Sequence, residues 1–183
     1  MPTTGELYPG SATTSQVAAG DIAWASLALS ADDGVGANVT VTGFTAAILT
    51  QRLKAVNYTM PAALSAACRI TGVIARIEGW GSGSCIMTSC NLLGTDKAVS
   101  GTNKSGTSGM LSATTVIYSH GTSIDLWGCA LTPTIVGNAN FGLGMRVRSR
   151  GAINTPKDIW VDYITLEIIY ENGNEMNVKF SEF

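Results

Sequence analysis

The run from Ile159 to Tyr170 constrains the fold most, because it is dense in the β-branched and aromatic residues that favour strands. In its second half the apolar residues alternate with others and share one face: Ile164, Leu166 and Ile168. In its first half Ile159 and Val161 fall in the opposite phase. Both sets can face one core only if an extra residue is inserted near Asp162 and Tyr163. The sequence therefore predicts a long strand with a β-bulge at that point.

The segment Asn140 to Ser149 predicts a second strand. Its apolar residues alternate with glycine and arginine: Phe141, Leu143, Met145 and Val147. This period is typical of a strand with one face in the core and the other in water. Ahead of both strands stands Asp125-Leu126-Trp127-Gly128, followed by Leu131-Thr132-Pro133, where Gly and Pro indicate a corner. We expect Trp127 to be buried there as an anchor.

Further strands are expected along the chain, at 39–49, 53–60, 70–80, 84–93 and 114–119. Ile70 stands three residues ahead of Val73, which indicates a second bulge at Thr71-Gly72. The loop 79–83 is expected to place Trp80 at an exposed tip and to return residues 84–93 as a hairpin partner. Together these patterns predict an all-β fold, an antiparallel two-sheet jelly-roll-like β-sandwich of about eight strands.

The length of 183 residues suits one all-β domain with extensions. Residues 1–20 are rich in Thr, Ser, Gly and Ala without an apolar period, and predict an extended N-terminal arm. This arm is expected to become ordered only along a partner subunit. Residues 21–170 form the predicted sandwich domain, and residues 171–183 a polar C-terminal tail.

The charge content is low, at 13%, and the net charge is −2. A protein that binds nucleic acid needs clustered Lys and Arg, so nucleic acid is not an expected partner. No run of about 18 apolar residues indicates a membrane span, and the N-terminus lacks the pattern of a signal peptide. We expect a soluble protein made in a cytoplasm, whose neutral polar surface suits close packing against neighbouring subunits.

The four cysteines are Cys68, Cys85, Cys90 and Cys129. They include no CxxC pair, and the single histidine is His120, so a zinc site is not expected. Two interpretations remain open: disulfides, within one chain or between chains, or small buried thiols. Cys85 and Cys90 differ in parity, so on a regular strand they would face opposite sides.

No constellation of residues predicts catalysis or a cofactor. Ser119, His120, Ser123 and Asp125 resemble parts of a nucleophilic triad, but they are adjacent in sequence and occupy one turn. Glu78 and Asp125 could flank a sugar, yet nothing in the sequence brings them together.

The pair Asp32-Asp33 before Gly34 could hold calcium or form a solvated turn. Without further oxygen ligands at fixed spacing we expect the turn, and no metal. The long loop 94–112 is rich in Gly, Ser and Thr and has few large apolar residues, which predicts a mobile loop or one with a short edge strand. We expect it to contact a partner through Lys97 and Lys104, together with Trp80.

Several turn and core motifs occur in a characteristic order: Gly20-Asp21-Ile22-Ala23-Trp24, Asp32-Asp33-Gly34, Tyr58-Thr59-Met60-Pro61, Ile70-Thr71-Gly72-Val73, Asp125-Leu126-Trp127-Gly128, Leu131-Thr132-Pro133, Asn140-Phe141-Gly142 and Val161-Asp162-Tyr163-Ile164. In this order the chain resembles a jelly-roll-like β-sandwich family of tailed-bacteriophage virion proteins, over roughly Ile22 to Tyr170. Related sequences tend to carry Asn-Pro after the first tryptophan, where this chain has Ala25-Ser26. The resemblance implies a structural role without a cofactor.

The expected function is that of a non-enzymatic structural protein of a tailed-bacteriophage virion. As an outer decoration or cement protein it would stabilise capsid or tail through subunit contacts, with copies of itself, as a homotrimer, and with the major capsid or tail proteins as partners. The alternative is a receptor-binding or carbohydrate-binding module of a phage tail fibre, with Trp80 and the loop 94–112 as its contact surface.

Overall fold

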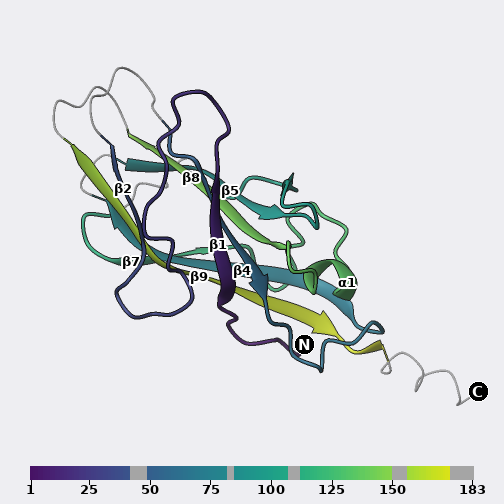
Figure 1. Ribbon diagram of the computed structural model, residues 1–183. Coiled ribbons are helices and arrows are strands. Elements are labelled where there is room, and N and C mark those ends of the chain that lie inside the picture. Colours follow the sequence, from purple (N-terminus) through teal and green to yellow (C-terminus); the bar gives the residue numbers. More distant parts are fainter. Residues whose placement is uncertain (42–48, 82–84, 107–111, 150–155, 174–183) are drawn as a thin grey trace, which may run out of the picture.

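Two antiparallel sheets pack face to face in the computed structural model, which describes residues 1–41, 49–81, 85–106, 112–149 and 156–173 (Figure 1). The five-stranded sheet has the order β1 (Pro9–Ser15), β3 (Arg52–Tyr58), β8 (Gly142–Ser149), β5 (Cys85–Leu93) and β6 (Val99–Ser100). The four-stranded sheet has the order β2 (Ala37–Val41), β9 (Lys157–Glu171), β4 (Arg69–Gly81) and β7 (Val116–His120). One short helix, α1 (Pro133–Val136), follows the Trp127 corner.

The connectivity is that of a jelly roll. From β2 onward, β2, β4, β7 and β9 enter the four-stranded sheet, while β3, β5, β6 and β8 enter the other. The prediction of an antiparallel two-sheet sandwich is thus confirmed. The expected hairpin of residues 84–93 with the preceding strand is wrong, because β5 pairs with β8 in the opposite sheet from β4.

The core lies between the sheets and is built from the inward-facing side chains of both sheets. From the four-stranded sheet it receives Val73, Ala75, Ile77, Ile159, Val161, Ile164, Leu166 and Ile168. From the five-stranded sheet it receives Leu53, Ala55, Cys85, Met87, Cys90, Leu92, Leu143, Met145 and Val147. Alternation along each strand places these side chains on one face, as the period of two requires.

Both predicted bulges are confirmed. Glu78 pairs with Tyr163 and the next residue of β4 pairs with Val161, so Asp162 is the extra residue of β9. A second register shift leaves Thr71 as the extra residue of β4. A third, unforeseen shift lies in β5 between Met87 and Ser89. It changes the phase of that strand, so Cys85 and Cys90 both reach the core instead of facing opposite sides.

The outer face of β8 is buried, and the expectation that it is wet is wrong. Arg146 points away from the core, yet it is only 9% exposed. Its guanidinium forms an ion pair with Asp21 at 2.6 Å and donates to the carbonyl oxygen of Thr50 at 3.0 Å. Segments distant in sequence therefore cover this face.

The N-terminal arm is extended, as predicted, but its partners lie in its own chain. Leu7 exchanges two backbone hydrogen bonds with Leu166, at 2.8 and 3.0 Å, beside the part of β9 that β2 leaves open. After Tyr8 the chain crosses to the other sheet, where β1 pairs with β3. The expectation that the arm is ordered only against a partner subunit is wrong. It was inferred from the amino-acid composition of the arm, and composition does not predict backbone hydrogen bonds to the open edge of a strand. Of the predicted tail, residues 174–183 lie outside the described residues.

The Trp127 corner is confirmed as an anchor. The Trp127 side chain is fully buried, and its indole N–H donates to the carbonyl oxygen of Val73 at 2.9 Å. Its backbone has φ +57°, and the carboxylate of Asp125 accepts its backbone N–H at 2.8 Å. Within the loop 94–112, β6 is the short edge strand that was one of the two expectations, and residues 107–111 lie outside the described residues.

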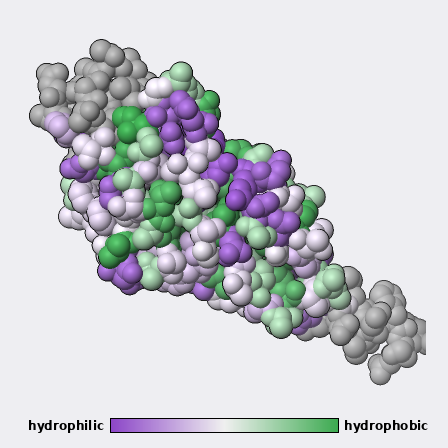
Figure 2. All heavy atoms as spheres, viewed as in Figure 1, coloured by the Kyte–Doolittle hydropathy of each residue, from purple (hydrophilic) through white to green (hydrophobic). Residues whose placement is uncertain are grey.

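No disulfide joins the four cysteines in the structure: Cys68, Cys85 and Cys90 are buried and Cys129 is half-buried. Burial raises the pKa of the Cys90 thiol far above its usual range. Of the helices that the structure describes, none is long and apolar enough to cross a membrane. Hydrophilic and hydrophobic residues are interspersed over the face seen in Figure 2.

Candidate functional site

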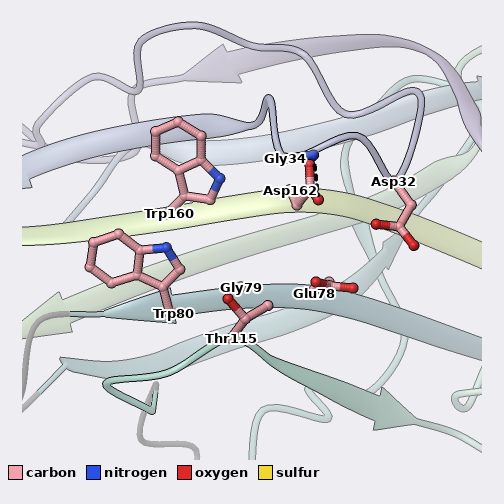
Figure 3. A pocket seen from close by; sticks show the side chains of 8 residues that line it. All are labelled: Asp32, Gly34, Glu78, Gly79, Trp80, Thr115, Trp160 and Asp162. Carbon is pink, nitrogen blue, oxygen red and sulfur yellow. Dashed lines mark hydrogen bonds between the residues drawn. The ribbon is translucent and has the colours of Figure 1, made fainter.

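A hollow of about 450 Å³ opens where β4, β9 and the turn before β2 meet (Figure 3). Its lining residues are Asp32, Gly34, Glu78, Gly79, Trp80, Thr115, Trp160 and Asp162. Glu78 and Trp80 alternate with the buried core residues of β4, so they stand on the outer face of the sheet. The volume lies in the range of small-molecule pockets, about 300–1,000 Å³.

The bulge in β9 builds the centre of the hollow. Because Asp162 is the extra residue, it and Tyr163 both lie opposite Glu78, while Val161 and Ile164 remain in the core. The Tyr163 hydroxyl donates a hydrogen bond to the Glu78 carboxylate. The bulge thus keeps the apolar residues of β9 in the core and places the side chains of Asp162 and Tyr163 beside the Glu78 carboxylate.

Asp32 reaches the hollow from the turn before β2. The turn is fastened to β9 by the backbone N–H of Gly34, which donates to Oδ2 of Asp162 at 3.1 Å. Close approach continues at Gly36, where an added Cβ would lie 2.0 Å from the carbonyl oxygen of Val161. Only glycine permits this packing. The neighbouring Asp33 caps its own turn, accepting the Val35 N–H at 2.9 Å.

Oxygen atoms of Asp32, Glu78 and Asp162, one from each residue, all lie within 4.8 Å of one another. Among the described residues no lysine or arginine forms an ion pair with any of them. Burial raises the pKa of Asp162, and the charges of Asp32 and Asp33 add to the rise, against hydrogen bonds from the backbone of Gly34 and Asp33. The site is therefore a concentration of negative charge without a described counter-ion.

Two tyrosine side chains lie near the carboxylates, and the negative charge of the site affects the pKa of both hydroxyls. The rings of Tyr8 and Tyr163 meet edge to face, with centroids 5.7 Å apart. Burial raises the pKa of both hydroxyls, and nearby carboxylates raise them further: Glu78 and Asp32 for Tyr163, and Asp32, Glu6, Glu78 and Asp162 for Tyr8. Both phenols therefore stay protonated near neutral pH, as hydrogen-bond donors.

Trp80 and Trp160 form the other end of the hollow. They are direct cross-strand partners on β4 and β9, both half-buried, and Figure 3 shows their rings side by side. A second hollow of about 330 Å³ is lined by Trp80, Ala113, Thr114 and Thr115, so Trp80 borders both spaces. Carboxylates at one end can accept hydroxyl protons or coordinate a cation, and aromatic faces at the other can stack on a flat or weakly polar ligand.

The structure brings together only part of the residues singled out in the sequence. Trp80 and Asp32 are in the hollow, but Trp80 belongs to β4 and not to a loop tip. Lys97 lies in the turn between β5 and β6, where its N–H donates to the Gly94 carbonyl. Lys104 forms an ion pair with Asp125 at 2.8 Å. This ion pair lies beside Val73, seven residues or about 23 Å along β4 from Trp80.

The structure does not bring Glu78 and Asp125 together: Asp125 lies beside Val73, where it pairs with Lys104 and accepts the Trp127 N–H. Sequence reasoning missed Asp162 and Trp160. The signal for Asp162 was its position at the predicted bulge, and the signal for Trp160 was its outward phase next to Val161.

We compared the chain with known protein families, with curated protein sequences and with solved structures, and none of them matches it. Interpretation of the site therefore depends on its geometry.

Proposed function

We propose that the chain is a non-enzymatic structural protein of a tailed-bacteriophage virion, made in the host cytoplasm. In this role it is an outer decoration or cement protein, assembled as a homotrimer on the major capsid or tail proteins. The observation that carries the proposal is the jelly-roll strand order, an architecture that recurs in viral capsid domains. The analogy of fold supports the proposal, and the order of the sequence motifs adds to this support.

The surface supports this proposal through its exposed apolar residues. On the edge strand β7, Val116 is 38% and Ile117 51% exposed. An edge strand with exposed β-branched residues can accept a neighbouring subunit. Exposed ion pairs such as Arg69–Glu171, whose side chains are 70% and 43% exposed, contribute little to association. Contacts of this protein should therefore depend weakly on salt.

The test is binding of the purified chain to particles that lack it, across a tenfold range of sodium chloride. We expect retention at all salt concentrations, loss with Ile117→Lys, and no loss with Val17→Lys, a matched exposed residue outside both β7 and the loop 94–112. Reductant should have no effect, because three of the four thiols are buried. Failure of the chain to bind any assembled particle, or release by salt alone, would contradict the proposal.

The predicted partner contacts are tested in the same assay. Lys97→Gln is the cleaner lysine variant, because Lys97 contacts its turn through its backbone, whereas the Lys104 side chain forms an ion pair with Asp125. We expect Lys97→Gln to weaken retention on particles. Unchanged retention would remove Lys97 from the contact surface.

A second candidate function is carbohydrate binding, and the paired Trp80 and Trp160 beside carboxylates favour it specifically. Aromatic faces stack on sugar rings, and carboxylates accept their hydroxyl protons. Glycan-array binding of the purified chain tests this function. We expect signals that Trp80→Ala and Trp160→Ala abolish and that Val17→Ala, at an exposed residue outside the hollow and the loop 94–112, leaves intact. A blank array, or signals insensitive to both tryptophan changes, would exclude the hollow as a glycan site.

A further inference from the structure

We propose that Asp32, Glu78 and Asp162 form a binding site for a divalent cation, with Ca²⁺ as the preferred ion. The three carboxylates come from three segments distant in sequence, and Figure 3 shows them converging at one end of the hollow. The inference depends on neither the virion role nor glycan binding, since it concerns the chain alone.

One carboxylate oxygen of the cluster is buried and unsatisfied. Asp162 is 5% exposed, and its Oδ1 is buried without a hydrogen-bond partner among the described residues. Its other oxygen is occupied by the Gly34 N–H. A buried carboxylate oxygen without a hydrogen-bond donor from the protein is costly, since its desolvation is not offset. A cation bound through Oδ1 of Asp162 would offset this cost.

Geometry agrees with an ion shared by the three residues. Two oxygens bound to one Ca²⁺ at 2.3–2.6 Å can lie up to roughly 5 Å apart, whereas for Mg²⁺ at 2.0–2.1 Å the limit is roughly 4 Å. One oxygen of each carboxylate lies within 4.8 Å of the other two, which is compatible with a shared Ca²⁺ after small side-chain movements. Carboxylate-rich sites with further ligands from water and backbone are also what Ca²⁺ takes in proteins.

The charge of the site also indicates a bound cation, independently of the distances between the oxygens. Three carboxylates crowd the site, and among the described residues neither an arginine nor a lysine pairs with them. The chain elsewhere pairs its crowded acids: Glu6 and Glu167 share Arg76, and Asp21 has Arg146. Asp32 is exposed, but Glu78 and Asp162 differ from the other half-buried acids of the described residues, each of which pairs with a lysine or arginine.

The ion would join the turn before β2 to β4 and β9, two strands that already pair with each other. Asp32 belongs to the turn before β2, Glu78 to β4 and Asp162 to the bulge of β9. Coordination of all three fixes the turn onto the sheet beside the tryptophan pair. We therefore expect Ca²⁺ to stabilise the folded chain and to order the wall of the hollow.

The experiment uses the full chain, freed of metal with chelator, then titrated with CaCl₂ by calorimetry and thermal unfolding. At a hundredfold excess over the dissociation constant, we expect the melting temperature to rise by about 5–10 °C. Asp162→Asn, Glu78→Gln and Asp32→Asn should each weaken Ca²⁺ binding at least about tenfold. Asp33→Asn is the matched control, because Asp33 caps its own turn and is outside the three-carboxylate cluster.

The sign of the effect separates ion binding from general damage. In chelator, Asp162→Asn should melt at or above the temperature of the unchanged chain, because the amide removes repulsion and still accepts the Gly34 N–H. In Ca²⁺ the order should reverse. Tb³⁺ luminescence excited through Trp80 and Trp160 gives a second readout that does not depend on stability.

Three results would overturn the site. These are no Ca²⁺-dependent shift in the unchanged chain, equal shifts in the unchanged chain and in Asp162→Asn, and a loss in Asp33→Asn as large as in Asp162→Asn. If Asp162→Asn fails to fold in chelator, the two less buried changes, Glu78→Gln and Asp32→Asn, decide the question by the same comparison. Equal affinity for Mg²⁺ would overturn the preference for Ca²⁺.

Discussion

The ion pair between Asp21 and Arg146 should be the most valuable charge interaction in the described chain. The side chains are 4% and 11% exposed, and the nitrogen–oxygen distance is 2.6 Å. Asp21 also accepts the backbone N–H groups of Val17 and Ala18, at 2.9 and 2.8 Å. We choose Asp21→Asn as the perturbation, since it keeps the shape and removes the charge.

The magnitude follows from what Arg146 loses. Removing one partner of a buried ion pair typically costs about 3–5 kcal/mol, because the other charge stays buried. Arg146 retains its hydrogen bond to the Thr50 carbonyl and one neutral acceptor in the new side chain. We therefore expect the free energy of unfolding to fall by about 3 kcal/mol at pH 7, the lower end of that range.

The pH dependence provides an independent check. Burial opposes ionisation of Asp21, but hydrogen bonds from Ala18 and Val17 and the charge of Arg146 outweigh it, so the pKa of Asp21 lies below its usual 3.8. A carboxylate with a lowered folded pKa contributes stability above the unfolded value, and this stability is lost as the pH falls through the folded value. The loss in free energy of unfolding caused by Asp21→Asn should thus be constant from pH 7 to about pH 5 and become smaller below pH 3.8.

Urea unfolding followed by tryptophan fluorescence, at pH 7 and at pH 3, measures both quantities. Glu171→Gln is the matched control, because its ion pair with Arg69 is largely exposed and should contribute under about 1 kcal/mol. If the two variants lose equal stability at pH 7, the reasoning from burial is refuted. A deficit of Asp21→Asn that is unchanged at pH 3 would show that its origin is packing and not charge.

Four further outcomes can be measured on the isolated chain. Trp127→Ala should cost about 3–5 kcal/mol in urea unfolding, because it empties a fully buried site, and a loss below about 1 kcal/mol would disprove the anchor. Gly36→Ala should cost about 1–3 kcal/mol, since its Cβ would meet the Val161 carbonyl, and neutral stability would show that the turn can shift. Residues 1–7 should resist limited proteolysis in the free subunit and lower the melting temperature when deleted; rapid cleavage would contradict their pairing with β9. Iodoacetamide should modify Cys129 before the three buried cysteines, as read by mass spectrometry, and a different order would contradict the burial of the thiols.

The sequence predicted the features that depend on the alternation of apolar and polar residues within one strand. The bulge at Asp162 could be inferred because Ile159 and Ile164 must share one core, and this requirement is written in the alternation itself. Burial of Trp127 followed from its corner of Gly and Pro in the same way. Sheet assignment could not be inferred locally: β5 follows β4 directly, yet jelly-roll connectivity sends it to the other sheet.

The failures have one physical origin, contact between segments far apart in sequence. Arg146 looked solvated because nothing nearby reveals that Asp21 covers it from 125 residues away. The candidate site has the same character, since Asp32 reaches Asp162 across 130 residues of chain. The individual signals were present, an acidic turn, an outward Glu78 and a bulge, but their convergence is a property of the fold.

The arm also sets how the subunit responds to mechanical load. Residues 2–7 run antiparallel to the end of β9, so Pro2 lies beside Tyr170 and the two ends of the described chain emerge at the same end of the sandwich (Figure 1). Tension between these ends would break the backbone hydrogen bonds between the arm and β9 one after another. It would not load all of them at once in shear. A subunit held by both ends would therefore yield first at its arm, while β9, paired along its length with β4, keeps the core closed.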